Sequence, residues 1–131
     1  MNGKKKKEKR KKKKDTSDFL TEIIIKGIQN KKGKNIVSLN LKNIDHAVSD
    51  YFIICHGTSN TQVQAIAESV EDKIFTTIGL KPWHREGVQN AEWILLDYVD
   101  VVVHIFQETV RNFFQIESLW ADAEVKLIEE D

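Results

Sequence analysis

The segment 50–70 constrains the fold of this chain most, because it joins an apolar run, a polar turn and a helical pattern. Residues 51–55 are continuously apolar, as in a strand that is covered on both faces. The turn Gly57-Thr58-Ser59 follows, and apolar side chains then recur at helical spacing from about Thr61 to Ile78. A helix that follows a buried strand allows a parallel crossover, so the segment predicts an α/β architecture.

The rest of the chain supplies the other elements of such a fold. Apolar residues at helical spacing between Leu20 and Ile28 predict a first helix, and the alternation of residues 37–42 predicts a half-buried strand. The later pattern predicts a short extended piece (83–86), two strands (93–96 and 101–106) joined by a tight turn (97–100), and a final helix (108–120). We therefore expect a mixed α/β (α+β) fold with a single sheet of about five strands and helices packed on its faces.

Charge divides the chain into parts of opposite sign. The formal net charge is zero, but residues 1–14 hold ten basic side chains and one acidic one, which leaves ten basic and nineteen acidic residues from Asp15 onward. We expect a disordered lysine-rich tail at 1–14, one globular domain at 15–122 and an acidic C-terminal tail at 123–131. The basic residues of the first tail are Lys4, Lys5, Lys6, Lys7, Lys9, Arg10, Lys11, Lys12, Lys13 and Lys14. They suit an arm for RNA or another polyanion, although a solvated leader or a nuclear-localisation signal has the same composition.

Composition argues against several kinds of protein. Cys55 is the single cysteine, so neither an internal disulfide nor a CxxC metal site can form, and its place at the end of an apolar strand predicts a small buried hydrophobe. No apolar run approaches the ~20 residues that span a bilayer, and no apolar stretch of a secretory signal follows the N-terminal lysines. The four histidines show no zinc-ligand spacing. We expect a cytoplasmic protein without a metal or other cofactor.

The turn Gly57-Thr58-Ser59 raises the question of catalysis, because a helix start of this kind can hold phosphate groups. A nucleotidyltransferase would also need carboxylates that alternate along a neighbouring strand to share a magnesium ion. Neither the strand 93–96 nor the strand 101–106 contains such a pair, and Asp97 and Asp100 lie three apart in the turn. We therefore expect no catalytic residues and interpret the turn as a scaffold feature that caps the helix.

Aromatic residues and one histidine are the better candidates for a binding surface. Trp93 follows Glu92, and Trp83 precedes a charged triplet, which is typical either of a protein-binding patch or of a half-buried strand end. Trp120 falls on the apolar stripe of the last predicted helix and is expected in the core. His104 lies in an apolar strand, either as a core histidine bonded to backbone or on the outward face of an edge strand that meets a partner.

Several motifs, in this order along 19–121, resemble the ribosomal silencing factor family, also called Iojap-like. They are Asp50-Tyr51-Phe52-Ile53-Ile54 leading to Gly57-Thr58-Ser59, Gln62-Val63 with Ala65-Ile66-Ala67, Glu86-Gly87, Trp93-Ile94-Leu95-Leu96-Asp97-Tyr98, Asp100-Val101-Val102-Val103-His104 and Glu117-Ser118-Leu119-Trp120. The resemblance implies a nucleotidyltransferase-like fold without catalytic carboxylates. It also implies a translation repressor that binds an L14-type protein of the large ribosomal subunit and sterically blocks joining of the two subunits.

The resemblance also implies where the partner binds. The family's partner-binding surface maps onto Trp93, and proximity in the motifs adds Glu86, Gly87, Asp97, Tyr98, Asp100 and His104. An acidic body suits a basic ribosomal protein. The lysine tail is expected to contact ribosomal RNA, no membrane contact is expected, and a homodimer is allowed.

This chain departs from the family pattern at three positions. Val99 replaces a glycine in the turn, where a positive φ would be strained, His56 replaces a small residue, and Phe114 replaces a tyrosine. Two other functions stay open at this point: a nucleotidyltransferase-like enzyme that uses the Gly57-Thr58-Ser59 turn, and a general RNA-binding protein that depends on its tail.

Overall fold

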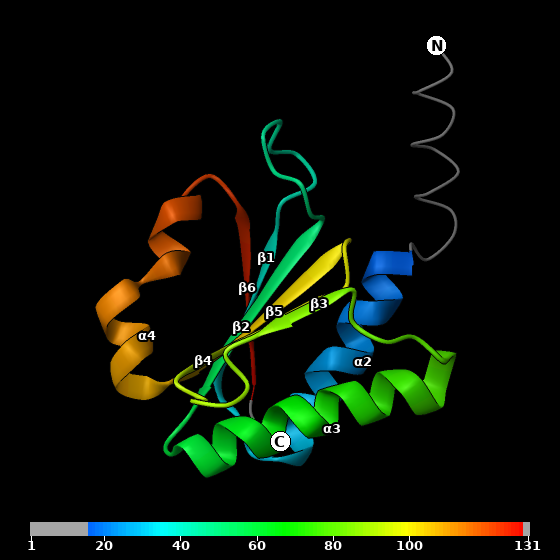
Figure 1. Ribbon diagram of the computed structural model, residues 1–131. Helices are drawn as coiled ribbons and strands as arrows, with labels where there is room; N and C mark the ends of the chain where they lie inside the picture. The colour runs from blue at the N-terminus through cyan, green and yellow to red at the C-terminus, as the bar shows by residue number, and fades with distance from the viewer. Residues whose placement is uncertain (1–15, 130–131) are drawn as a thin grey trace.

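A computed structural model describes residues 16–129 of the protein, which form one six-stranded sheet with helices on both faces (Figure 1). The strands lie in the order β3-β4-β5-β2-β1-β6. The lysine-rich residues 1–14 lie outside the described residues. In chain order the elements are α2 (Thr16–Asn30), β1 (Lys34–Asn40), β2 (Tyr51–Gly57), α3 (Asn60–Ile78), β3 (His84–Glu86), β4 (Trp93–Asp97), β5 (Val101–Gln107), α4 (Glu108–Phe114), the short 3-10 helix η1 (Ile116–Trp120) and β6 (Glu124–Ile128).

The sheet is mixed, as the sequence predicts. β2 and β5 pair in parallel along their whole length, from Tyr51 opposite Val101 to Gly57 opposite Gln107. The other strand pairs are antiparallel, including the hairpin of β4 and β5. Helix α3 begins the connection that leads from β2 to the edge strand β3, and the chain then reaches β5 through β4. Because β5 lies parallel to β2, the crossover expected from segment 50–70 is present.

Helices α2 and α3 cover one face of the sheet and pack closely against each other. Their apolar sides meet the inward side chains of the strands in one large buried cluster, which also contains the fully buried Cys55. Gly27 allows the close approach, since a Cβ there would lie 2.9 Å from the Cα of Val70. The Ser69 hydroxyl donates to the Gly27 carbonyl at 2.7 Å and fixes the crossing point.

The opposite face is covered only in part, by α4 and η1. Its buried residues form a smaller cluster, with half-buried aromatic side chains at the margin. We call this side the outer face of the sheet. The buried members are Val37, Leu39, Leu41, Ile54, Phe106, Ile116 and Ala123, and the aromatic ones are Phe52, Trp93 and Trp120.

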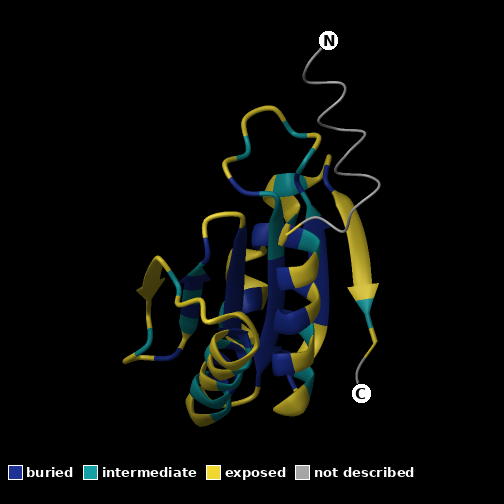
Figure 2. Ribbon diagram, turned by 90° about the vertical axis from the view of Figure 1, so that its right-hand side faces the viewer, coloured by how far each residue is buried: buried dark blue, intermediate teal, exposed yellow. Residues whose placement is uncertain are grey.

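The sheet has a sixth strand where the sequence predicts an acidic tail. β6 lies within residues 123–131 and pairs antiparallel with β1, for example Lys126 opposite Ser38. Figure 2 shows β6 exposed along most of its length, unlike the buried strands in the middle of the sheet. Its backbone pairing holds it in place although Val125 and Leu127 stay exposed. The alternation of polar and apolar residues in 124–127 is short, and the acidic residues around it suggested a tail instead.

The final helix predicted for 108–120 is wrong, because the chain breaks it at Gln115. That residue has φ 48° and ψ 50°, and its N–H donates to the Arg111 carbonyl at 2.9 Å, which closes α4. The segment therefore does not place one apolar stripe against the core. Phe113 is 80% exposed, and Trp120, which was expected in the core, is only half-buried.

A candidate partner-binding surface around Trp93

The outer face of β3, β4 and β5 brings together four of the residues expected to bind a partner. Residues that pair across antiparallel strands share a face of the sheet. Leu95 is opposite both Glu86 and His104, and residues two apart on β4 share its face. Trp93, Glu86, Asp97 and His104 therefore lie on the same face.

Trp93 is held in one orientation by contacts with β5 and α4. Its indole N–H donates to Nδ1 of His104 at 3.1 Å. Its ring centroid lies 4.7 Å from that of Phe106 and 5.1 Å from that of Phe114. The side chain is half-buried, so it offers apolar area to a partner while its polar atom is already bonded.

His104 is buried beside Trp93, and burial lowers its pKa to about 4. Because the indole N–H only donates, Nδ1 must be the accepting nitrogen, and the neutral ring then carries its proton on Nε2. No described residue accepts a hydrogen bond from Nε2. Both sequence interpretations of His104 need correction: the core histidine bonds to an indole rather than to backbone, and β5 is an interior strand rather than an edge.

The other three expected residues have different positions. Gly87 lies against the backbone of Trp93. It has φ 76°, and a Cβ there would lie 2.0 Å from the Trp93 carbonyl oxygen. Tyr98 is buried in the cluster on the helix side, where burial raises its pKa above the usual range. Asp100 is exposed at the turn, and its carbonyl accepts from the Asp50 and Tyr51 N–H groups. The structure thus does not bring the Tyr98 side chain to the outer face.

The turn between β4 and β5 has the positive φ that the glycine of the family pattern suggests. Val99 has φ 74°, and the Asp100 N–H donates to the Tyr98 carbonyl at 2.9 Å, which is the hydrogen bond of a γ-turn. A β-branched residue is strained there. Oδ1 of Asp97 accepts from the Val99 N–H at 2.8 Å, and the Ser49 hydroxyl donates to the Val99 carbonyl at 2.9 Å. These two bonds help to hold the turn.

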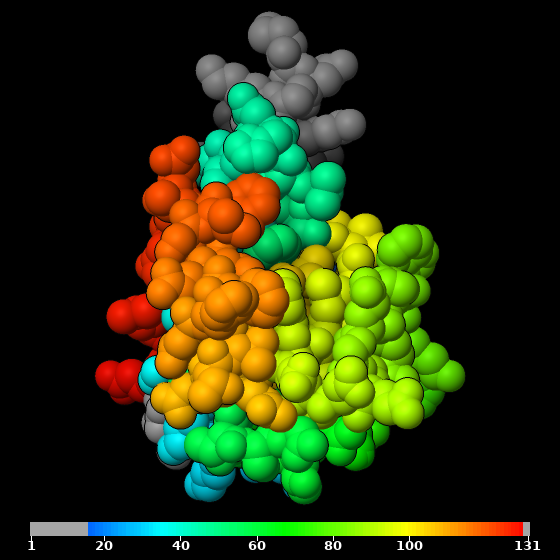
Figure 3. Space-filling model, turned by 60° about the vertical axis from the view of Figure 1, so that its left-hand side comes forward, coloured from blue at the N-terminus to red at the C-terminus, as the bar shows by residue number. Residues whose placement is uncertain are grey.

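Sequence reasoning missed the contribution of α4 to this surface. Phe114 is half exposed and touches Trp93, and the ring of Phe113 lies 5.1 Å from that of Phe114. In the space-filling view of Figure 3, α4 (orange) lies directly beside the segment around β4 (yellow-green). The adjacent aromatic residues after a strand were visible in the sequence, but the predicted continuous helix assigned them to the core.

The Gly57-Thr58-Ser59 turn is occupied by the protein itself. Ser59 caps α3 by accepting from the Gln62 N–H at 3.1 Å. Oε1 of Gln62 in turn accepts from the Thr58 N–H at 2.8 Å, so a backbone donor that could face a phosphate is bonded to the helix. Residues 16–129 contain no group of three or more His, Cys, Asp or Glu side chains that could hold a metal ion.

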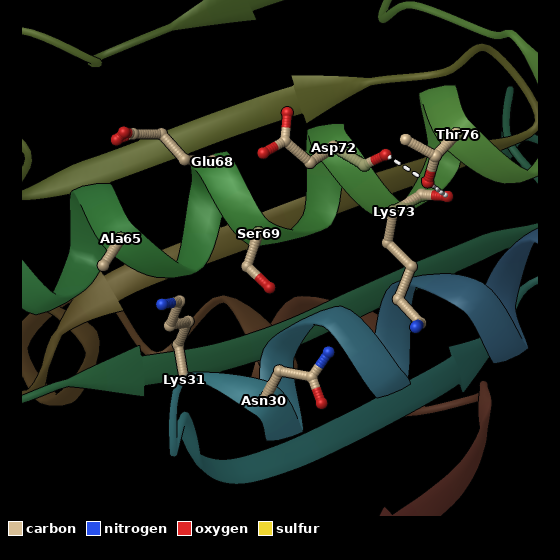
Figure 4. A pocket seen from close by; sticks show the side chains of 8 residues that line it. All are labelled: Asn30, Lys31, Ala65, Glu68, Ser69, Asp72, Lys73 and Thr76. Carbon is tan, nitrogen blue, oxygen red and sulfur yellow. Dashed lines mark hydrogen bonds between the residues drawn. The ribbon is translucent and has the colours of Figure 1, made fainter.

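An open hollow of about 470 Å³ lies between α2 and α3 (Figure 4). These helices cover the face of the sheet opposite to Trp93. Lys31 lines the hollow from the end of α2, and Glu68, Asp72 and Lys73 line it from α3. The hollow mixes both signs of charge and is shallow, so its chemistry selects no ligand class.

The model of a known family covers nearly all of this chain. The family described as ribosomal silencing factor during starvation matches residues 10–131. The chain belongs to the ribosomal silencing factor family. This family is named for silencing of the ribosome rather than for a catalytic reaction.

Individual members of the ribosomal silencing factor family are similar in sequence and in fold. The Ribosomal silencing factor RsfS of Halalkalibacterium halodurans is 39% identical over 104 residues, which are 79% of this chain and 87% of that protein. The chloroplastic protein Iojap of Zea mays is 36% identical over 76 residues, 56% of this chain and 31% of that protein. A crystal structure of a Chromobacterium violaceum protein matches with a TM-score of 0.73 at 31% identity, covering 85% of this chain and 92% of that one.

Within residues 16–129, no helix of the protein is both long and apolar enough to cross a membrane.

Proposed function

We propose that the protein represses translation in the cytoplasm by binding the large ribosomal subunit through its L14-type protein and keeping the small subunit away. Membership of the ribosomal silencing factor family carries this proposal. The outer face around Trp93 is the surface that we assign to the contact. It combines a half-buried, fixed tryptophan with the carboxylates of Glu86 and Asp97, and such aromatic anchors often dominate binding energy.

Charge supports a basic partner for this surface. Residues 83–131 contain eleven acidic side chains and three basic ones. Two of the three basic residues are ion-paired within the protein, Arg85 with Glu71 at 3.0 Å and Arg111 with Glu117 at 2.9 Å. The net negative charge favours encounter with a basic ribosomal protein and disfavours bare RNA at this face.

Sedimentation of ribosomal subunits in a sucrose gradient tests the proposal. Saturating protein should leave the two subunits apart under conditions in which they otherwise join. Trp93→Ala should restore joining, because it removes the fixed ring. Phe75→Ala is the matched control, since Phe75 is a half-exposed aromatic residue on α3, on the opposite side of the sheet. Normal joining in the presence of saturating wild-type protein contradicts the proposal.

The lysine-rich tail is proposed to add contacts to ribosomal RNA. Each phosphate that a lysine neutralises releases counterions, so this part of the affinity depends on salt. Deletion of residues 2–14 should weaken binding to large subunits and flatten its salt dependence, while leaving the loss caused by Trp93→Ala intact. If the deletion abolishes binding altogether, the protein is a tail-driven RNA-binding protein instead.

A further inference from the structure

Arg111, in the middle of α4, is a buried cation. It is 7% exposed, and its guanidinium donates to three neighbours. Nη1 lies 2.7 Å from the Asn35 carbonyl and 3.0 Å from Nδ1 of His56, while Nε and Nη2 lie 3.2 and 2.9 Å from Oε2 of Glu117. Because arginine cannot accept a hydrogen bond, Nδ1 of His56 must be the accepting nitrogen.

These bonds join four separate parts of the chain. Asn35 belongs to β1, His56 to β2, Arg111 to α4 and Glu117 to η1. Helix α4 has only seven residues, and it ends at Gln115 by a bond to the carbonyl of Arg111 itself. The guanidinium therefore fixes both the place of α4 on the sheet and the angle at which η1 leaves it.

The position of α4 decides whether Phe114 reaches Trp93. Phe114 lies three residues after Arg111, about one helical turn further along. Its ring contacts that of Trp93, and the ring of Phe113 contacts it in turn, which makes a continuous row of three aromatic rings. This row runs from the sheet onto α4 and becomes more exposed along its length, since Trp93 is half-buried, Phe114 is 50% exposed and Phe113 is 80% exposed.

We propose that Arg111 is a positioning residue for the partner-binding surface: its bonds to Asn35, His56 and Glu117 hold α4 so that Phe114 and Phe113 extend the Trp93 surface. This inference rests on the proposed function. It adds α4 to the contact and gives the buried network a role beyond stability.

The aromatic row also specifies the chemistry of the partner side chains. Guanidinium groups stack on aromatic faces, and this surface lies in the acidic half of the protein. The row therefore suits arginine side chains of a basic protein, which can stack on the rings and pair with carboxylates nearby.

A double-mutant cycle tests whether Arg111 acts through Phe114. The affinity of the full-length protein for purified large ribosomal subunits is measured for the wild type, Arg111→Met, Phe114→Ala and the double variant, with melting temperatures alongside. Each single change should weaken binding about tenfold, the scale of one aromatic pair. The double variant should lose little more than either single one, because the two changes remove the same contact.

Control variants separate positioning from stability. Arg111→Lys, which keeps the charge, should recover part of the affinity. Leu119→Ala removes another exposed apolar side chain, from η1, and should bind like the wild type. If Arg111→Met does not fold, Glu117→Gln takes its place in the cycle, since it weakens the same ion pair. Additive losses in the cycle, or wild-type affinity in Phe114→Ala, overturn the inference.

The outcomes also distinguish this inference from the proposed function. If wild-type protein does not bind large subunits, both fail. If it binds and Trp93→Ala loses binding, while Phe114→Ala and the variants of the Arg111 network bind normally, the proposed function stands and the role of Arg111 is refuted.

Discussion

The replacement Gly87→Ala tests the close contact beneath Trp93. Gly87 follows the edge strand β3 and has φ 76°, and an added Cβ would lie 2.0 Å from the Trp93 carbonyl oxygen and 3.5 Å from the Cα of Ile94. The nearest atom is backbone, so no side chain can rotate away. Gly79, at the end of α3, is the matched control: it has φ 69°, but nothing lies within 4 Å of a Cβ built there.

The two glycines separate backbone strain from steric overlap. An L-residue in the left-handed region costs roughly 1–2 kcal/mol, and removal of glycine from the unfolded chain offsets roughly 0.5–1 kcal/mol of that. Gly79→Ala should therefore lower the free energy of unfolding by about 1 kcal/mol. Gly87→Ala should lose the same amount and a further ~1–3 kcal/mol, because inserting a carbon into a filled space has a cost of that size.

Thermal and urea denaturation, followed by circular dichroism, measure this difference. For a domain of about this size, 1 kcal/mol shifts the melting temperature by roughly 4 °C, so Gly87→Ala should melt at least about 4 °C below Gly79→Ala. Gly87→Ala should also weaken binding to large ribosomal subunits, since it displaces the backbone of Trp93, whereas Gly79→Ala should not. Equal melting temperatures for the two variants refute the close approach of Gly87 to Trp93.

Three further predictions concern buried groups. Burial lowers the pKa of His104 to about 4 from an ordinary value near 6.5, so the unfolded chain binds a proton more readily than the folded one. The contribution of neutral His104 to the free energy of unfolding should be complete above pH 6.5 and should fall by up to about 1.4 kcal/mol per pH unit toward pH 4. His104→Gln should remove this slope. Cys55 is fully buried and burial raises the pKa of its thiol to about 12, so modification by a thiol reagent should require opening of the fold, and equal labelling rates in native and urea-unfolded protein would contradict this. Gly27→Ala should destabilise the protein by roughly 1–3 kcal/mol in urea denaturation, because its Cβ would meet the backbone of Val70; unchanged stability would show that α2 and α3 can separate freely.

Local sequence patterns predicted the helices and strands that bury a regularly spaced set of apolar side chains. The strand β2 and helix α3, with the polar turn that caps its start and Gly79 at its end, follow from apolar spacing and cap residues alone. The hairpin of β4 and β5 follows from two apolar runs on either side of a short turn. The departure of Val99 from glycine left the shape of its turn open, since a positive φ there would be strained, and the structure gives Val99 that positive φ.

Prediction from the sequence was wrong where a long-range contact replaced the local signal. β6 pairs with β1 through the backbone, and the acidic residues around its alternation of Glu124, Val125, Lys126 and Leu127 suggested a tail instead of a strand. The break at Gln115 accompanies the contacts that Arg111 makes with β1 and β2, and no local pattern near 108–120 contains them.

The sequence by itself determined the family and the mixed sheet, because these depend on motifs and on periodic apolar residues. The tertiary structure alone decided which residues share the Trp93 surface. Sheet register placed Glu86, Asp97 and His104 on the outer face, and strand alternation sent Tyr98 to the helix side. The contribution of α4 required the folded chain, since the bonds that position it join residues as far apart as Asn35 and Arg111.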